Sequence, residues 1–256
     1  MKLFREGELA NPEAGFESGM REFTPEQTAQ LERYYELLLD WNSRINLTAI
    51  TEHDAVWQRH FRDSVMPGEY LTLPEEIPSD GDVGTRLLDM GTGAGFPGIP
   101  LKICYPGLQV TLVDYLQKRI GFLEAVIHEL GLTGITAIHG RAEELAAPGA
   151  PLRESFDLVT SRAVARLSTL SEYCVPFLKV GGQFIAYKSP DCTEELTDAK
   201  QAIFLLGGRL DRVETFELPA VGDEPPQGRT LIFIKKQQST AKTYPRRAGL
   251  PSKKPL

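Results

Sequence analysis

Short apolar runs alternate with helical patterns along most of this 256-residue chain, and no other feature limits the fold as strongly. Such alternation is typical of βαβ crossovers, which build a parallel sheet with helices on both faces. Near the end of the chain two runs follow each other without a helix between them, so the last strand is expected to be antiparallel. We therefore predict a doubly wound α/β fold with a mostly parallel, seven-stranded sheet. The predicted strands cover residues 86–90, 109–113, 135–138, 156–160, 182–187, 209–218 and 229–236, and the helices between them cover 97–104, 117–130, 165–178 and 193–206.

Helices are predicted to precede the sheet. Thr24, Pro25 and Gln27 have the form of a capping box with proline in the first helical turn, and apolar residues then recur on one helical face. A second helix is expected over 52–65, followed by a connector rich in proline and glycine. The predicted parts of the chain are an N-terminal extension of residues 1–23 that we expect to be flexible, a helical segment 24–84, a main domain 85–236 and a basic C-terminal tail 237–256.

The composition argues against several classes of protein. With 41% hydrophobic and 25% charged residues, the chain is of ordinary globular type. No stretch approaches the roughly 18 to 20 apolar residues of a membrane helix, and residues 1–13 lack the apolar centre of a signal peptide, so we expect a soluble cytoplasmic protein. Cys104, Cys174 and Cys192 are far apart, and the four histidines are scattered, which predicts neither a disulfide framework nor a metal site.

A glycine-rich loop follows the first predicted strand. Residues 89–98 read DMGTGAGFPG, in which Gly91, Gly93 and Gly95 alternate with other residues before a helix begins. Alternating glycines let the backbone turn sharply and come close to a ligand, and open α/β sheets bind ligands at this end of their strands. Asp89, two residues before the first glycine, can either orient the loop or accept a hydrogen bond from a cationic amino group.

An acidic residue ends the second predicted strand. Asp114 lies 19 residues after Gly95, a position from which a carboxylate can bind both hydroxyls of a ribose. Each feature alone also has a plain structural explanation, a tight packing turn or a solvated strand end. Their joint spacing favours a ligand that carries an adenosine-like ribose.

Two classes of cofactor are compatible with this loop. Residues 93–98 also fit the pattern GxGxxG, which is typical of nicotinamide and flavin enzymes. A dinucleotide places its pyrophosphate on free N–H groups of a helix N-terminus, and Pro97 and Pro100 remove two of these donors. S-adenosylmethionine has no phosphate, and Asp89 could receive its ammonium group. The loop and the antiparallel last hairpin together resemble class I S-adenosylmethionine-dependent methyltransferases, which have a Rossmann-like fold.

The loop after the fourth strand bears on the atom that is methylated. Residues 160–164 read TSRAV, which lacks the Asn/Asp-Pro-Pro-aromatic sequence of enzymes that methylate exocyclic amines. Cytosine C5 enzymes need a cysteine nucleophile, and none is predicted at a strand end. Guanine N7 requires no proton removal, so that alignment and charge placement suffice. Arg162 and Lys188 are placed to donate to guanine O6, although each could also be a surface charge paired with an acid.

Several longer motifs are spread over nearly the whole chain. They are WN at 41–42, NLT at 46–48, RHFRDS at 59–64, DMGTGAGFPGIPL at 89–101, KR at 118–119, GRAEE at 140–144, SRA at 161–163 and YPRRAG at 244–249. Together they resemble the ribosomal RNA small-subunit methyltransferase G family, also called glucose-inhibited division protein B, from Thr24 to the C-terminus. The resemblance implies transfer of methyl from S-adenosylmethionine, with S-adenosylhomocysteine as product, to N7 of a guanosine in small-subunit (16S) ribosomal RNA.

The resemblance also implies roles for individual residues. The cofactor would contact Asp89, Gly91, Gly93, Gly95 and Phe96 around its methionine part, Asp114, Tyr115 and Leu116 at the ribose and adenine, Ala142 and Glu143 at the adenine edge, and Arg162 beside it. The candidates for catalysis and RNA contact are Arg162, Lys188, Arg141 and His60. His60 and Asp63, three residues apart on a predicted helix, could pair near the RNA, or His60 could be a buried structural histidine.

The C-terminal tail is basic although the net charge of the chain is −7. Seven basic residues and no acids lie between Lys235 and Leu256. The tail is predicted to be either a disordered end or a flexible clamp for RNA phosphates, and we favour the clamp. On this hypothesis, removal of residues 242–256 weakens RNA binding and leaves cofactor affinity unchanged. We expect a monomer that binds small-subunit ribosomal RNA or the 30S particle; the alternative is an RNA- or ribosome-binding module with a non-catalytic cofactor pocket.

Overall fold

The computed structural model describes residues 21–79, 84–162 and 165–256. Most of the expected flexible extension, residues 1–20, lies outside the described residues. So do residues 80–83 of the connector and residues 163–164 of the loop after the fourth strand.

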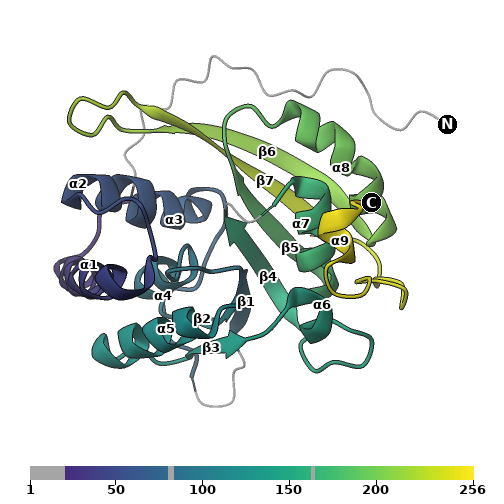
Figure 1. The fold of residues 1–256 in the computed structure, drawn as a ribbon, viewed down its shortest axis with the longest axis horizontal. Coiled ribbons are helices and arrows are strands. Elements are labelled where there is room, and N and C mark those ends of the chain that lie inside the picture. Colours follow the sequence, from purple (N-terminus) through teal and green to yellow (C-terminus); the bar gives the residue numbers. More distant parts are fainter. Residues whose placement is uncertain (1–20, 80–83, 163–164) are drawn as a thin grey trace.

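Seven strands form one sheet in the order β3-β2-β1-β4-β5-β7-β6 (Figure 1). They are β1 (Thr85–Met90), β2 (Leu108–Asp114), β3 (Ile135–His139), β4 (Phe156–Arg162), β5 (Leu178–Lys188), β6 (Gly208–Leu218) and β7 (Gln227–Lys236). The neighbours from β3 to β5 are parallel, and β7 lies between β5 and β6, antiparallel to both. The predicted doubly wound sheet with an antiparallel last strand is therefore confirmed. Its order reverses at β1 and β4, the switch point where such sheets bind ligands.

Helices cover both faces of the sheet (Figure 1). On one face α4 (Gly98–Cys104) and α5 (Gln117–Glu129) pack with α1 (Pro25–Ile45), and on the other lie α7 (Leu167–Cys174) and α8 (Thr193–Leu205). Because successive strand residues point to opposite faces, Leu87 of β1 is buried in the first core and Leu88 in the second. The two layers meet at the sheet and hold β1 rigidly between them.

The N-terminal helix begins as the sequence predicts. Thr24 Oγ1 accepts a hydrogen bond from Gln27 N, and Gln27 Oε1 accepts one from Thr24 N, which is the expected capping box. The helix ends where Asn46 takes a left-handed conformation with φ of 51°. On this helix Leu31, Tyr34 and Leu38 are buried, so its apolar face packs against the first core.

The second predicted helix, 52–65, differs from a regular α-helix. It consists of α2 (His53–Val56), the π-helix η1 (Trp57–Arg62) and α3 (Asp63–Val65). A π-helical turn is wider than an α-helical turn and is found often at functional sites. His60 lies within this turn. Three further short elements were not predicted: η2 (Met66–Glu69), α6 (Ala142–Leu145) and α9 (Leu250–Lys253). The predicted helix 165–178 is found as α7 and ends in the 3-10 turn η3 (Val175–Phe177).

The basic tail is folded against the domain, with α9 beside α7 (Figure 1). Arg246 donates to both carboxylate oxygens of Glu172, a side chain with 0% exposure, at 2.6 to 3.0 Å. Thr240, Pro245 and Pro251 are buried. The tail is therefore folded, and the prediction of a disordered or flexible tail is wrong. Composition alone does not reveal that a buried acid elsewhere in the chain binds Arg246.

Candidate active site

Three polar residues from adjacent strands lie at the carboxyl edge of the sheet. Asp89 is near the end of β1, Asp114 ends β2 and Arg162 ends β4. The strands are neighbours at the switch point, so the side chains at their ends lie close together. The structure thus brings the glycine loop, the predicted ribose carboxylate and the predicted catalytic arginine to one place.

Asp89 is fully buried beneath the glycine loop. Its Oδ2 accepts from Thr92 Oγ1 at 2.6 Å and from Gly98 N at 2.9 Å, and its Oδ1 accepts from Thr160 Oγ1 at 3.1 Å. Burial raises the pKa of the carboxyl to about 6 although these hydrogen bonds favour the charged form. All three partners are protein groups. Of the two predicted roles, this favours orientation of the loop over direct contact with a cofactor's amino group.

Two glycines of the loop serve different purposes. A Cβ at Gly93 would meet nothing within 4 Å, and φ there is +61°. A Cβ at Gly98 would lie 2.3 Å from Leu112 Cδ2 and 3.0 Å from Asp89 Oδ2. Gly98 therefore allows α4 to approach the sheet, whereas Gly93 borders open space where a ligand can approach the backbone.

Asp114 connects the glycine loop to the turn after β2. Its Oδ2 accepts from Gly93 N at 3.0 Å and forms an ion pair with Arg119 at 3.0 Å, and its Oδ1 accepts from Leu116 N at 2.9 Å. The carboxylate is thus fixed beside the open face of Gly93. Like Asp89, it is buried and accepts from donors of its own chain, so the ribose contact stays a prediction.

An exposed aromatic ring lies next to Asp114. Tyr115 is 57% exposed, and the guanidinium carbon of Arg141 lies 5.9 Å from the centre of its ring. Arg141 precedes α6, so the turns after β2 and β3 meet here. Such a pair offers a flat surface and a positive charge at the rim of the site.

The predicted adenine-edge residues lie on α6. Ala142 and Glu143 are buried, and Glu143 Oε1 accepts from Gly249 N of the tail at 2.8 Å. No motif or spacing in the sequence indicates that the tail reaches this carboxylate.

Arg162 is held by contacts from the N-terminal helical segment. It donates to Asp63 Oδ2 at 2.8 Å, to the carbonyl oxygen of Arg59 at 3.2 Å and to His60 Nδ1 at 3.2 Å. Its guanidinium carbon lies 5.1 Å from the ring centre of Phe96. The cation is therefore fixed in position over the end of the glycine loop.

His60 is a neutral partner of this cation. Burial and the charges of Arg162 and Arg229 lower the pKa of His60 to about 3. A guanidinium can only donate, so Nδ1 of His60 is the acceptor and Nε2 carries the proton. Nε2 donates to Thr48 Oγ1 at 2.9 Å. The ring also stacks on Phe96 with 4.5 Å between ring centres. These contacts favour the alternative of a buried structural histidine over a catalytic base.

Asp63 joins three parts of the fold. The buried carboxylate binds Arg162 of β4 and also lies 3.3 Å from Arg229 Nε of β7. The predicted pairing of His60 with Asp63 takes an indirect form, because both side chains contact Arg162.

Phe96 is only 5% exposed, so most of its surface packs within the protein.

Lys188 lies at the end of β5 and is paired with an acid. Its Nζ lies 2.6 Å from Glu195 Oε2 and donates to the carbonyl oxygen of Ala165 at 2.7 Å. Glu195 also accepts from Leu167 N, the first residue of α7. These contacts support the alternative that Lys188 is a charge paired with an acid, and not a role in catalysis.

Sequence reasoning missed residues that hold the loop. The Tyr34 hydroxyl of α1 donates to the carbonyl oxygen of Ala94, and Thr92 and Thr160 donate to Asp89. The helical period showed that Tyr34 is buried. Its partner, 60 residues away, could not be read from the same pattern.

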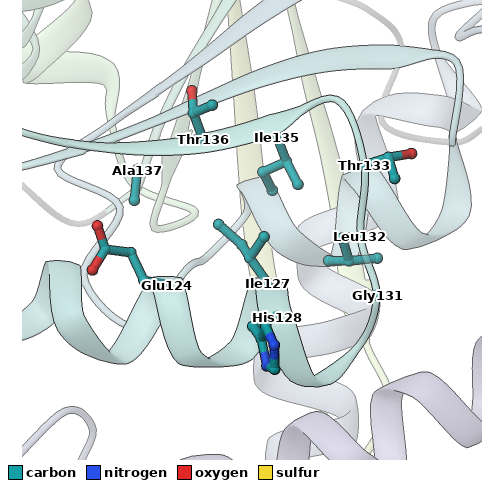
Figure 2. A pocket seen from close by; sticks show the side chains of 9 residues that line it. All are labelled: Glu124, Ile127, His128, Gly131, Leu132, Thr133, Ile135, Thr136 and Ala137. Atoms are coloured by element: carbon teal, nitrogen blue, oxygen red, sulfur yellow. The ribbon is translucent and has the colours of Figure 1, made fainter.

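A wide groove of about 570 Å³ lies elsewhere on the molecule (Figure 2). It is lined by the end of α5, including Ile127 and His128, and by Ile135 at the start of β3. The start of a parallel strand lies at the amino edge of the sheet, opposite the glycine loop. This groove is therefore separate from the site described above.

The start of α4 does not suit a pyrophosphate. Pro97 and Pro100 lack an N–H, Gly98 N is bonded to Asp89, and Ile99 N donates to the carbonyl oxygen of Gly95. Each of these positions is a proline or has its donor used within the protein, so a dinucleotide would find its usual amide contacts taken.

Three further observations concern the described residues as a whole. Within residues 21–79, 84–162 and 165–256, no group of three or more His, Cys, Asp or Glu residues is placed to hold a metal ion. None of the helices in these ranges is long and apolar enough to cross a membrane. The three cysteines are free and buried, and burial raises the pKa of each thiol, that of Cys104 to about 12.

The fold and the loop define a class I S-adenosylmethionine-dependent methyltransferase. Residues 27–221 match the family model described as rRNA small subunit methyltransferase G, and the chain belongs to this family. Among curated relatives named Ribosomal RNA small subunit methyltransferase G, the protein of Lachnoclostridium phytofermentans is 54% identical over 90% of both chains. That of Brevibacillus brevis is 47% identical over 91% of this chain and 92% of its own. Among solved structures, M. jannaschii TYW2 in complex with AdoMet shares the fold with a TM-score of 0.51 and 14% identity, over 73% of this chain and 79% of that one.

Proposed function

We propose that this chain transfers the methyl group of S-adenosylmethionine to N7 of a guanosine in small-subunit (16S) ribosomal RNA. The observation that carries the proposal is the hydrogen bond between Gly93 and Asp114 at the switch point of the sheet, in a chain of the rRNA small subunit methyltransferase G family. The bond places a fixed carboxylate beside the open face of a glycine loop. The names of the relatives supply the substrate class.

The residues of the site fit this cofactor. Asp114 can accept from ribose hydroxyls, Gly93 leaves room for a ligand at the loop, and Tyr115 with Arg141 offers an exposed surface for an adenine ring. When bound, the cofactor supplies a methyl group on a positively charged sulfur. The methionine part requires no phosphate-binding amides, which agrees with the start of α4.

The side chains around the site favour a nucleophile that needs no deprotonation. His60 has a pKa of about 3 and is a poor base at neutral pH. The buried cysteines have raised pKa values and are poor thiolate nucleophiles. Guanine N7 carries a lone pair and can attack a methyl group directly. Catalysis then rests on alignment of the two reactants and on charge placement.

Arg162 is assigned the orientation of the guanine. Asp63, His60 and the Arg59 carbonyl hold its guanidinium beside the loop. A cation fixed in this way can donate toward guanine O6 and leave N7 free to react. Arg141 is assigned to RNA contact at the rim.

RNA phosphates are expected to contact the folded tail. Its exposed basic residues are Lys242, Arg247, Lys253 and Lys254. Since the tail is anchored through Glu172 and Glu143, these charges form a fixed surface and not a loose clamp. We also propose that the protein acts in the cytoplasm and that it is a monomer. Sedimentation velocity can test the oligomeric state.

Calorimetric titration of S-adenosylhomocysteine tests the cofactor assignment. Asp114→Ala should weaken binding at least tenfold, about 1.4 kcal/mol, because a charge-assisted hydrogen bond is lost. The matched control is Asp157→Ala, since Asp157 lies near the amino edge of the sheet and accepts from Arg86 N. NAD should give no heat of binding. Binding of NAD with no response to S-adenosylhomocysteine would overturn the assignment.

Single-turnover transfer of a labelled methyl group to 30S particles tests catalysis. Primer extension or mass spectrometry then identifies the modified guanosine. A protein that binds the cofactor and the particle but transfers no methyl would instead be the RNA-binding module with a non-catalytic pocket.

A further inference from the structure

Three of the contacts that attach the tail to the domain are made to α6 and α7. Arg246 is bound by both oxygens of Glu172, Thr169 Oγ1 donates to the carbonyl oxygen of Pro251 at 3.2 Å, and Gly249 N donates to Glu143 Oε1 at 2.8 Å. The first two contacts are to α7 and the third is to α6.

The third contact reaches the proposed nucleoside site. Glu143 is the second residue of α6, and α6 follows directly after Arg141, whose guanidinium lies over Tyr115. Glu143 is 8% exposed, and its Oε1 accepts the hydrogen bond from the Gly249 N–H. Gly249 has a φ of +78° and precedes α9, and this left-handed turn directs its N–H toward the carboxylate.

We propose that the C-terminal tail positions Glu143 for the adenosine part of the cofactor, which makes Gly249 and Arg246 positioning residues for cofactor binding. The inference rests on the proposed cofactor site. Gly249 holds one carboxylate oxygen through its N–H, which leaves the other free to accept from a ligand amine. Arg246 acts one step further away, because its bonds to Glu172 fix the backbone from which Gly249 donates.

This role reverses the expectation drawn from composition. A phosphate clamp alone would leave cofactor affinity unchanged when it is removed. A tail that orients Glu143 must change cofactor affinity even in the absence of RNA. Removal of the whole segment is a poor test, because it would leave the buried Glu172 without its partner and destabilise the fold.

Two substitutions at Gly249 test the contact with Glu143. Gly249→Pro removes the donor and cannot adopt the left-handed φ. Gly249→Ala is the matched control, because it keeps the N–H, carries the cost of a positive φ, and its Cβ would meet nothing within 4 Å. Calorimetry at 15 °C should show that Gly249→Pro raises the Kd for S-adenosylhomocysteine about tenfold, as expected for loss of a hydrogen bond to a charged group. Gly249→Ala should stay within about twofold.

A double-mutant cycle with Glu143→Ala decides whether the tail acts through Glu143. If it does, Gly249→Pro has no further effect on Kd in the Glu143→Ala background. Equal fold-changes in both backgrounds would overturn the proposal, as would an unchanged Kd for Gly249→Pro while Asp114→Ala weakens binding. Failure of the proposed function itself is distinguishable, since the unmodified protein would then not bind S-adenosylhomocysteine. Circular dichroism confirms that each variant is folded at the temperature of titration.

Discussion

At the scale of single residues, burial and Arg162 together determine the protonation state of His60. Burial and the charge of the guanidinium, which donates to His60 Nδ1, lower the pKa of the ring to about 3. The histidine in turn fixes one edge of the guanidinium. We therefore describe His60 as a positioning residue for Arg162.

Replacement of His60 should affect turnover more than substrate affinity. An asparagine can still accept from Arg162 through its amide oxygen, whereas alanine cannot. We expect single-turnover methyl transfer to fall about tenfold or more in His60→Ala and to be largely restored in His60→Asn. Comparable losses in the two variants would show that packing on Phe96, and not the acceptor atom, is what His60 provides.

The same residue makes folding stability depend on pH. The pKa of His60 is lowered in the folded protein, so on acidification the unfolded chain takes up a proton that the folded chain does not. Stability is therefore lost as the pH falls below the unfolded value of about 6.5, by about 2 kcal/mol at pH 5. Urea denaturation at pH 7.5 and pH 5 should show a smaller loss in His60→Asn than in the unmodified protein. The raised pKa of Asp89 acts in the opposite direction and is common to both proteins, so it cancels in the comparison.

Residue types and spacing showed which side chains lie at the site, but not which atoms they contact. Asp89 and Lys188 were both identified at strand ends. In the structure Asp89 accepts hydrogen bonds from three donors of its own chain, and Lys188 forms an ion pair with Glu195. The partners of both side chains are at least three positions away in the sequence or on other elements, so a local pattern could not reveal them.

At the scale of elements, α1 supports the glycine loop. Its capping box and apolar period predict where it begins and which face is buried. The hydrogen bond from Tyr34 to Ala94 shows what that face does, because it holds the loop between two glycines.

Removal of this hydroxyl should loosen the loop. We expect Tyr34→Phe to lower stability by about 1 kcal/mol, the usual net value of a hydrogen bond, and to weaken S-adenosylhomocysteine binding about fivefold. Tyr35→Phe is the matched control, because the Tyr35 hydroxyl donates to the carbonyl oxygen of Thr51, away from the loop. Equal effects of the two substitutions on the Kd would contradict a role of Tyr34 in the loop.

Regular elements were predicted well and short or irregular ones were not. All seven strands were found, because strands covered by helices on both faces of a sheet read as short continuous apolar runs. The π-helical turn of η1 shares its apolar pattern with an ordinary helix. The four-residue helices α6 and α9 are too short to show a period. Two of these missed elements carry His60 and Glu143.

At the scale of the whole molecule, charge is distributed unevenly over a globule with a net charge of −7. The composition located the basic residues in the tail, but it could not show that Arg246 is neutralised by Glu172. The cations that stay exposed are therefore fewer than the sequence implies, and they are fixed in place.

This arrangement should appear in the salt dependence of RNA binding. Each phosphate contact contributes about 0.7 to 0.9 to the slope of log K against log salt concentration. We expect the triple variant Arg247→Ser, Lys253→Ser, Lys254→Ser to lower that slope by about 2 in filter binding to 30S particles between roughly 50 and 200 mM salt. Lys179→Ser, at the amino edge of the sheet, serves as the control for loss of a charge. An unchanged slope would remove the tail from the RNA interface.

The bond between Tyr34 and Ala94 also limits how such enzymes can be recombined. A chimera that keeps this sheet and borrows its helical segment from another methyltransferase would lose this bond wherever the borrowed helix has no hydroxyl at the position of Tyr34. Grafting would then damage cofactor binding before any new substrate could be tested. The unit of exchange is therefore the helix together with residues 91–96, two stretches far apart in the chain that form one functional part.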